Sequence, residues 1–191
     1  PLWGKMLNVE KSRIDKVYSN EKLLPIIQAL GTGIGDDFNI DNLKYGKIVI
    51  MADADVDGAH IRTLLLTMLY RLTPTLINDG KVFIAESPLY EITSKNDVYF
   101  AYDEAEKDKF IAEIGKEKFT IQRSKGLGEN EPDMMSLTTM HPSTRRLIRV
   151  TPENAESTSR MFDVLLGDNI TDRKEYIADN GGKYMEMLDL S

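Results

Sequence analysis

One stretch of the chain, residues 47–69, constrains the fold more than any other. It opens with a short run rich in β-branched residues, Ile48 to Met51, and closes with apolar residues three and four positions apart. Branched side chains suit a strand that is packed on both faces. The later spacing is typical of a helix with one buried face. The pattern therefore predicts a buried strand followed directly by a helix, which is the building unit of an α/β fold.

Three carboxylates lie at this junction, Asp53, Asp55 and Asp57, and Gly58 follows them. In an open α/β sheet, ligands bind at the carboxyl ends of the strands. Three negative charges in one short turn repel each other, and a divalent cation neutralises them. Hard oxygen ligands suit magnesium or calcium. We therefore predict that Asp53, Asp55 and Asp57 hold a metal ion.

Other kinds of site share this pattern. A calcium-binding EF-hand loop also begins D-x-D-x-D-G, but it needs a glutamate at its twelfth position, which is Leu64 here, and a helix rather than a strand before it. A second alternative stays open: the turn is solvated and only caps the helix, with Asp57 as the N-cap residue.

A phosphotransferase of the haloacid dehalogenase type also places D-x-D after a buried strand, with the first aspartate as nucleophile. Such an enzyme needs a small hydroxyl residue near the fifth motif position, which is Asp57 here, and a later acidic pair after a strand, which the sequence lacks. Phosphatase activity that is lost in Asp53→Asn would support this alternative.

Length and composition limit the class of protein to which the chain can belong. A chain of 191 residues without cysteine fits one domain with an appendage, or two small domains, and forms no disulfide. We find no signal peptide and no long uncharged apolar run, so we expect no membrane insertion and a cytoplasmic location. The first residue is Pro1 rather than Met, so we expect the chain to be part of a longer protein.

Charge is unevenly distributed. The net charge of −7, taken alone, argues against binding to nucleic acid. Residues 121–150, however, carry five basic side chains against three acidic ones. Distribution matters more than the sum, because binding depends on local charge.

A second motif with chemical meaning follows a strand predicted at residues 119–122. Its sequence is Lys125-Gly126-Leu127-Gly128. Two glycines allow the backbone to approach a phosphate closely, and Lys125 adds a positive charge beside it. The motif alone is weak. Together with the acidic cluster it predicts that a metal ion and a lysine converge on one phosphate.

The remaining patterns predict an alternation of helices and strands. A strand at 81–86 completes a strand–helix–strand crossover unit with residues 47–69. A hairpin at about 90–103 is inserted after it. The glycine run from Gly31 to Gly35 predicts the end of a helix. Further helices are predicted at 8–18, 21–30 (capped by Ser19-Asn20), 104–114, 131–140, 152–166 and 171–179 (capped by Thr171), and an extended basic run at 145–150.

Several long motifs resemble the B subunits of DNA gyrases, and they occur in the family's order. They are Pro1-Leu2-x-Gly4-Lys5-x-Leu7-Asn8-Val9-Glu10, the segment from Asp53 to Leu66, Pro88-Leu89-Tyr90, Lys125 to Glu129, Thr138-Thr139-Met140 and Leu165-x-Gly167-Asp168. The resemblance implies an α/β TOPRIM domain with a Rossmann-like parallel sheet and helices on both faces, at residues 1–129. A mostly helical C-terminal tail would follow at residues 130–191. The topoisomerase IV B subunit is a near relative of this family.

The resemblance also implies a function in an ATP-dependent type IIA topoisomerase. In this family a tyrosine of the partner A subunit attacks a DNA phosphate, and the TOPRIM carboxylates hold magnesium there. Asp53 and Asp55 would be metal ligands, and Asp57 would support or bind a second ion. The matching DNA contacts would be Lys5, Asn8, His60, Arg62 and Lys125. The intact enzyme would be an A2B2 heterotetramer on double-stranded DNA in the bacterial nucleoid.

The chain also departs from the family pattern. The family's upstream Glu-Gly-Asp-Ser-Ala segment, with one metal-binding glutamate and the first strand of the sheet, is absent, as are the ATP-binding domains. Trp3 stands where relatives usually have Arg or Lys, and Ala52, Ser124 and Ser136 replace a usual Thr, Tyr and Trp. These differences leave a divergent paralogue open. A subunit-binding or DNA-docking module without catalysis is the remaining alternative.

Overall fold

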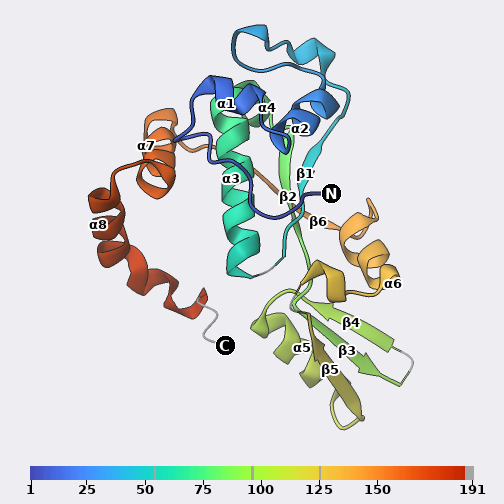
Figure 1. The fold of residues 1–191 in the computed structure, drawn as a ribbon. Coiled ribbons are helices and arrows are strands. Elements are labelled where there is room, and N and C mark those ends of the chain that lie inside the picture. The colour runs from blue at the N-terminus through green and yellow to red at the C-terminus, as the bar shows by residue number, and fades with distance from the viewer. Residues whose placement is uncertain (54, 96, 125, 188–191) are drawn as a thin grey trace. The chain divides into compact units, whose positions relative to one another are not determined.

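The computed structural model describes residues 1–53, 55–95, 97–124 and 126–187. The chain divides into two compact units (Figure 1). The first comprises Pro1–Ile48, His60–Val82 and the described residues from Arg149 onward, and the second comprises Val49–Ala59 and Phe83–Ile148. The domain boundary expected between residues 129 and 130 stays a prediction. Among the described residues, no helix combines the length and the apolar character that crossing a bilayer requires.

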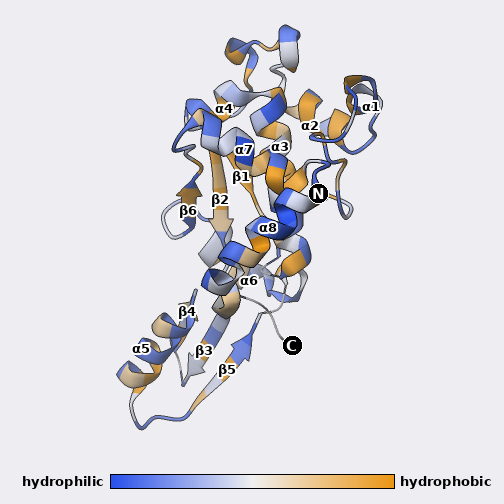
Figure 2. Ribbon diagram, turned by 90° about the vertical axis from the view of Figure 1, so that its left-hand side faces the viewer, coloured by the Kyte–Doolittle hydropathy of each residue, from blue (hydrophilic) through white to orange (hydrophobic). Residues whose placement is uncertain are grey.

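The predicted crossover unit is confirmed. Strand β1 (Ile48–Ile50) leads to helix α3 (Val56–Leu72), then to the short helix α4 (Pro74–Asn78) and to strand β2 (Val82–Glu86), which pairs with β1. The amide of Ile48 donates to the carbonyl of Lys81 at 2.8 Å, so the two strands begin side by side and run parallel. Figure 2 shows that both strands are largely hydrophobic.

The third strand of this sheet is antiparallel. Strand β6 (Arg146–Arg149) is the other neighbour of β2. The amide of Val150, just after β6, donates to the carbonyl of Val82, at the start of β2, at 3.0 Å. The end of one strand thus meets the beginning of the other. The sheet is therefore mixed, with β6 as a largely exposed edge strand, which is common in α/β sheets.

Helix α3 supplies much of the core of the first unit. Its inner face buries four large apolar side chains and Thr67, whose hydroxyl donates to the carbonyl of Thr63 at 2.8 Å. Around it, fully buried apolar side chains include one each from α1 (Ile14–Tyr18), α2 (Leu23–Leu30), α4 and β2; these are Val17, Leu23, Leu76 and Val82.

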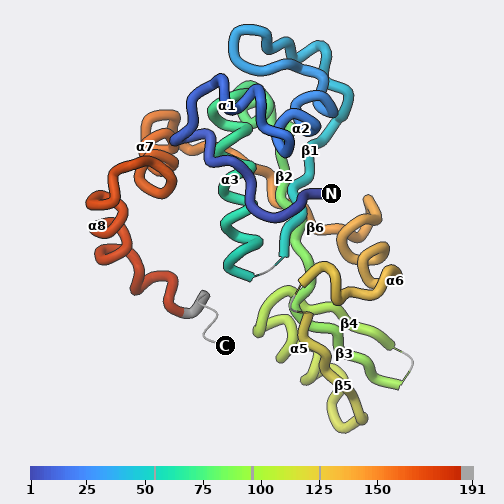
Figure 3. Tube along the Cα trace, in the orientation of Figure 1, coloured from blue at the N-terminus to red at the C-terminus, as the bar shows by residue number. Residues whose placement is uncertain are grey.

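The N-terminal segment forms less helix than its sequence predicts. Residues 1–13 precede α1 as a non-helical chain (Figure 3). The side-chain oxygen of Asn8 accepts from the amide of Glu10 at 3.1 Å, which favours a turn over a helix. Helix α2 begins two residues later than expected, and Lys22 directly before it makes no side-chain cap. The side chain of Asn20, one of the two expected cap residues, accepts from the amides of Lys22 and Leu23. Gly31, at a φ of 81°, ends α2, and two short 3-10 turns follow, Gly35–Asp37 and Ile40–Asn42.

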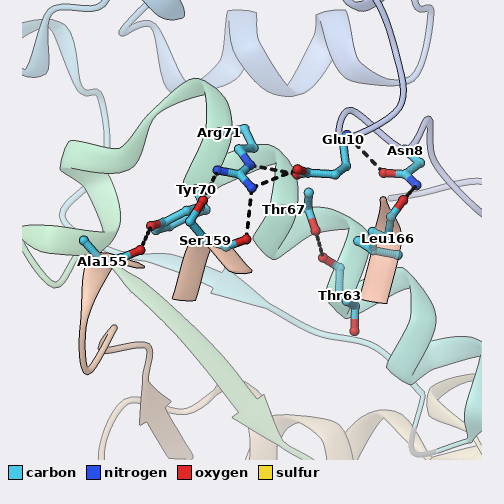
Figure 4. A network of polar contacts seen from close by, with 9 residues as sticks. All are labelled: Asn8, Glu10, Thr63, Thr67, Tyr70, Arg71, Ala155, Ser159 and Leu166. Carbon is cyan, nitrogen blue, oxygen red and sulfur yellow. Dashed lines mark hydrogen bonds and ion pairs between the residues drawn. The ribbon is translucent and has the colours of Figure 1, made fainter. Parts of the chain in front are cut away.

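A network of polar contacts joins the N-terminal segment, α3 and α7 (Figure 4). The guanidinium of Arg71 contacts both carboxylate oxygens of Glu10, at 2.7 and 2.8 Å, and the hydroxyl of Ser159 at 2.8 Å. Nearby, the amide nitrogen of Asn8 donates to the carbonyl of Leu166 at 2.8 Å. Because Glu10 and Arg71 are mostly buried, they tie the three segments more firmly than a surface pair.

The C-terminal helices begin at asparagines. Helix α7 (Ala155–Leu166) is capped by Asn154, three residues into the predicted range, and α8 (Ile170–Asn180) is capped by Asn169 rather than Thr171. In each case the side-chain oxygen accepts two backbone amides of the first turn. A 3-10 stretch, Gly181–Met187, follows α8.

The second unit contains an antiparallel sheet in the order β4-β3-β5. The predicted hairpin is β3 (Tyr90–Ser94) with β4 (Asp97–Ala101), and β5 (Phe119–Arg123) pairs with the other edge of β3. Helix α5 (Glu104–Ile114) packs on this sheet, and the rings of Tyr99 and Phe110 lie 5.2 Å apart.

The predicted helix at 131–140 has two parts. Helix α6 (Pro132–Met135) continues as a π-helical turn, Ser136–Met140. The buried Thr138 hydroxyl donates to the carbonyl of Met134 at 2.7 Å. A short 3-10 turn, Leu127–Glu129, precedes them.

Candidate functional site

The two chemical motifs of the sequence meet at Asp53. Its Oδ1 accepts a hydrogen bond from the backbone amide of Leu127 at 2.7 Å. Gly126 lies against the same carboxylate: a Cβ added there would stand 3.3 Å from Cγ of Asp53. The loop after β5 thus touches the first carboxylate of the loop after β1, as the predicted convergence of the two motifs requires.

Gly58 is required by the backbone of Asp53. A Cβ at position 58 would lie 2.1 Å from the carbonyl oxygen of Asp53 and 2.9 Å from its nitrogen. No side chain fits in that space. The glycine that ends the acidic motif therefore lets the loop fold tightly back onto the first turn of α3.

Asp55 caps helix α3. Its Oδ1 accepts from the amide of Gly58 at 2.6 Å, and α3 begins at the next residue, Val56. The N-cap is therefore Asp55, and the assignment of that role to Asp57 is wrong. Asp57 is exposed in the first helical turn, where a negative charge interacts favourably with the helix dipole.

The donor chemistry of this loop suits a hard cation. A carboxylate offers about four lone-pair positions, so one amide bond each leaves Asp53 and Asp55 with oxygen lone pairs for a metal. Within the described part of the chain, however, no group of three or more His, Cys, Asp or Glu side chains is placed to hold a metal ion. Carboxylates are the right kind of ligand for such an ion, and the metal role of the three aspartates stays a prediction.

The loop after β5 is held in place by its own contacts. The amide of Ser124 donates to the carbonyl of Leu89 at 2.9 Å. The hydroxyl of Ser124 donates to the side-chain oxygen of Asn130. These bonds fix both ends of the segment that presents Gly126 and Leu127 to Asp53.

The other predicted site residues are described one by one. Lys5, Asn8, His60 and Arg62 belong to the first unit. Lys5 and His60 are exposed, and Arg62 is half-buried. Both ends of the Asn8 amide group are engaged within the protein, with Glu10 and Leu166. Lys125 lies outside the described residues.

Sequence reasoning missed the groups that position the carboxylates. The amide of Leu127 and the carbonyl of Leu89 are backbone groups. Every residue type supplies the carbonyl and every type except proline supplies the amide N–H, so no sequence signal marks them. Two sequence signals could have been used. Gly58 stands directly after the acidic run, and Asn130 stands two residues after Gly128 in a predicted turn.

One electrostatic coupling of the second unit lies at the start of α5. The Arg146 guanidinium stands 3.8 Å from the centre of the Tyr102 ring and 2.8 Å from the Glu106 carboxylate. The Tyr102 amide, with Arg146, lowers the pKa of Glu106. Burial raises the pKa of Tyr102. These contacts hold α5 against strand β6.

Comparisons with known proteins agree with this arrangement. Residues 1–87 match the Toprim domain, and residues 116–178 match the family described as DNA gyrase B subunit, carboxyl terminus. The DNA gyrase B subunit of Treponema denticola is 50% identical over 181 residues, which are 94% of this chain. That of Thermotoga maritima is 47% identical over 98% of the chain, and that of Halalkalibacterium halodurans 48% identical over 100%.

The match covers only part of each relative. The chain spans 28%, 29% and 30% of the lengths of these three proteins. Within that span the two matched regions hold both motifs that meet at Asp53. The chain belongs to the DNA gyrase B subunit family, of which it carries the Toprim domain and the carboxyl-terminal region.

Proposed function

We propose that this chain is the part of a type IIA DNA topoisomerase B subunit that seats Mg²⁺ at the DNA phosphate being cut and rejoined. The observation that carries the proposal is the bond between Asp53 and the amide of Leu127, which joins the acidic loop to the glycine loop. A metal-binding carboxylate and a backbone that a phosphate can approach closely are thereby brought to one place.

Each residue of the loop has a role in this proposal. Asp53 and Asp55 hold the metal, Asp57 supports a second ion, and a glutamate elsewhere in the complete subunit completes the ligands. When bound, Mg²⁺ supplies Lewis-acid stabilisation of charge on the phosphate oxygens. The amides of Leu127 and Gly58 fix the rotamers of the first two carboxylates, so their remaining oxygens are aimed before metal arrives.

The attacking group comes from elsewhere. We propose that the A subunit supplies the tyrosine nucleophile, in an A2B2 assembly on double-stranded DNA in the nucleoid. Lys5, His60, Arg62 and Lys125 contact the DNA backbone. ATP belongs to other domains of the complete subunit. The same roles fit a topoisomerase IV B subunit or a divergent paralogue.

A non-catalytic alternative has one observation in its favour. Asp55 does cap α3, so the acidic loop has a structural role without any metal. In that case the chain is a subunit-binding or DNA-docking module, and its carboxylates are not needed for cleavage.

Asp55→Asn separates the two functions. Asparagine is as good an N-cap as aspartate, so the helix is kept while a metal-binding oxygen is lost. In the complete B subunit reconstituted with an A subunit, we expect Mg²⁺-dependent DNA cleavage to fall about 100-fold or more.

The control is Asp172→Asn, which changes an acidic residue in the first turn of α8 and should cleave like the parent. If Asp55→Asn also cleaves like the parent, the metal-seating function is wrong and the capping role is sufficient.

A further inference from the structure

The loop after β5, which bonds Asp53, is closed at its base by two side chains. The hydroxyl of Ser124 donates to the side-chain oxygen of Asn130, six positions later in the chain. The same hydroxyl lies 3.4 Å from the carbonyl oxygen of Gly126. Both side chains are half-buried, so water competes less for their bond than at an exposed site. The segment that they enclose carries the Leu127 amide, the donor to Asp53.

Asn130 also ties this loop to the helix that follows it. Its side-chain nitrogen lies 3.6 Å from the sulfur of Met135, the last residue of α6. An asparagine side chain has an acceptor oxygen and a donor nitrogen, so Asn130 serves both partners at once. The bond between Ser124 and Asn130 is therefore a link between the end of β5 and the approach to α6.

Backbone bonds inside the loop fix its internal turn. The amide of Glu129 donates to the carbonyl of Gly126 at 3.1 Å, and the amide of Asn130 donates to the carbonyl of Leu127 at 3.4 Å. Both bonds join residues of the loop, so they do not set its distance from Asp53. That distance matters, because a hydrogen bond weakens steeply when its donor moves out of line. The side-chain link at the base of the loop is placed to set it.

We propose that Ser124 and Asn130 are a positioning pair for the metal site, which acts through the Leu127 amide on Asp53. The proposal rests on the metal-seating function above and deepens it, because it names the side chains that hold the orienting amide in place. Partners that orient a metal ligand affect how tightly the metal binds. Loss of the pair should therefore raise the Mg²⁺ concentration that cleavage needs and leave the rate at saturating Mg²⁺ nearly unchanged.

Amide hydrogen exchange in the chain without metal tests the positioning itself. In Ser124→Ala we expect the Leu127 amide to exchange about 2- to 10-fold faster, the effect of losing one hydrogen bond that supports it. Amides of strand β3 should stay protected as in the parent. Ser124→Thr keeps a hydroxyl and should restore the protection of Leu127. The control is Ser143→Ala, which removes an exposed hydroxyl in contact with His141 and should leave Leu127 unchanged.

The Mg²⁺ dependence of DNA cleavage gives the second readout, in the complete B subunit reconstituted with an A subunit. Ser124→Ala should raise the half-saturating Mg²⁺ concentration about 2- to 10-fold. The rate at saturating Mg²⁺ should stay within about twofold of the parent. Asn130→Ala should behave in the same way. The double variant should be no worse than either single one, because both changes remove the same bond.

Three results would overturn the positioning pair. They are parental exchange of Leu127 in Ser124→Ala, an equal loss of protection throughout β3, which would indicate a general loss of stability, and a parental Mg²⁺ dependence.

The metal-seating function fails separately. If Asp55→Asn cleaves like the parent, that function is wrong whatever Ser124→Ala does to the Leu127 amide. If Asp55→Asn loses cleavage while Ser124→Ala keeps the parental Mg²⁺ dependence, the metal-seating function stands and the positioning pair is wrong.

Discussion

Contacts of Asp53 hold the acidic loop in its folded form. Its side chain is bound by the amide of Leu127, and its main chain passes so near Gly58 that a Cβ there would be 2.1 Å from its carbonyl oxygen. Position 58 therefore tolerates only glycine. This explains why a residue with poor helix propensity stands inside the first turn of α3.

Gly58→Ala tests this at the residue scale. In an ordinary helical position the change stabilises a protein by about 1 kcal/mol. Here we expect it to lower the free energy of unfolding by about 1–3 kcal/mol, because the new methyl group forces the Asp53 backbone to move. Urea unfolding followed by circular dichroism gives the difference.

Gly46→Ala is the matched control. No heavy atom lies within 4 Å of a Cβ added at position 46, so its effect should stay within about 0.5 kcal/mol. A Gly58→Ala protein more stable than the parent would contradict the close approach of Asp53.

At the scale of elements, helix ends are decided by short polar contacts. Helix α5 begins with a reciprocal cap: Asp103 accepts from the amide of Glu106, and Glu106 accepts from the amide of Tyr102. Arg146 then binds Glu106 from strand β6. One carboxylate thus links the start of a helix to a distant strand.

This link predicts a pH dependence. The Tyr102 amide and Arg146 hold the pKa of Glu106 below its ordinary value of 4.5. A depressed folded-state pKa adds stability above the unfolded-state pKa, and that stability is lost as the pH falls through the folded-state pKa. We therefore expect Glu106→Gln to destabilise the protein by about 1 kcal/mol at neutral pH.

The difference between parent and Glu106→Gln should shrink as the pH falls below about 4.5, measured by urea unfolding at a series of pH values. Glu113→Gln, on the same helix with Lys109 3.9 Å away, serves as control and should change little at any pH. A Glu106→Gln effect that is constant from neutral to acid pH would argue against the proposed linkage.

At the scale of the whole molecule, the chain holds two compact units and less than a third of the length of its relatives. In the described residues no three acidic, histidine or cysteine side chains are grouped for a metal. The proposed function takes a further glutamate ligand from elsewhere in the complete subunit, so we expect this chain alone to bind Mg²⁺ weakly.

Two measurements on the chain alone follow from this. Calorimetry should show weak Mg²⁺ binding that Asp53→Asn weakens further, because two or three carboxylates without their partner ligand make an incomplete site. A gel assay should show no DNA cleavage with or without Mg²⁺. Tight stoichiometric binding that survives loss of Asp53 and Asp55 would mean that the site lies elsewhere.

Much of the fold was predictable because its signals are local. The strand at Ile48, the helix with the buried Leu64 and Leu69, and the hairpin at β3 and β4 follow from hydrophobic spacing and turn residues alone. The errors in helix position arose where asparagine side chains accept hydrogen bonds from backbone amides. Asn8 turns the chain where a helix was expected, and Asn154 and Asn169 cap helices whose starts were assigned to Pro152 and Thr171.

The sequence by itself determined the α/β class, the three aspartates at a strand–helix junction and the family of the chain, because these lie in runs of neighbouring residues. Only the tertiary structure decided that β6 is antiparallel, that Asp55 rather than Asp57 caps α3, and that Asp53 meets Leu127 from 74 positions away. These features depend on which backbone donors lie nearby and on how much room the surrounding atoms leave. The identity of a single residue determines neither.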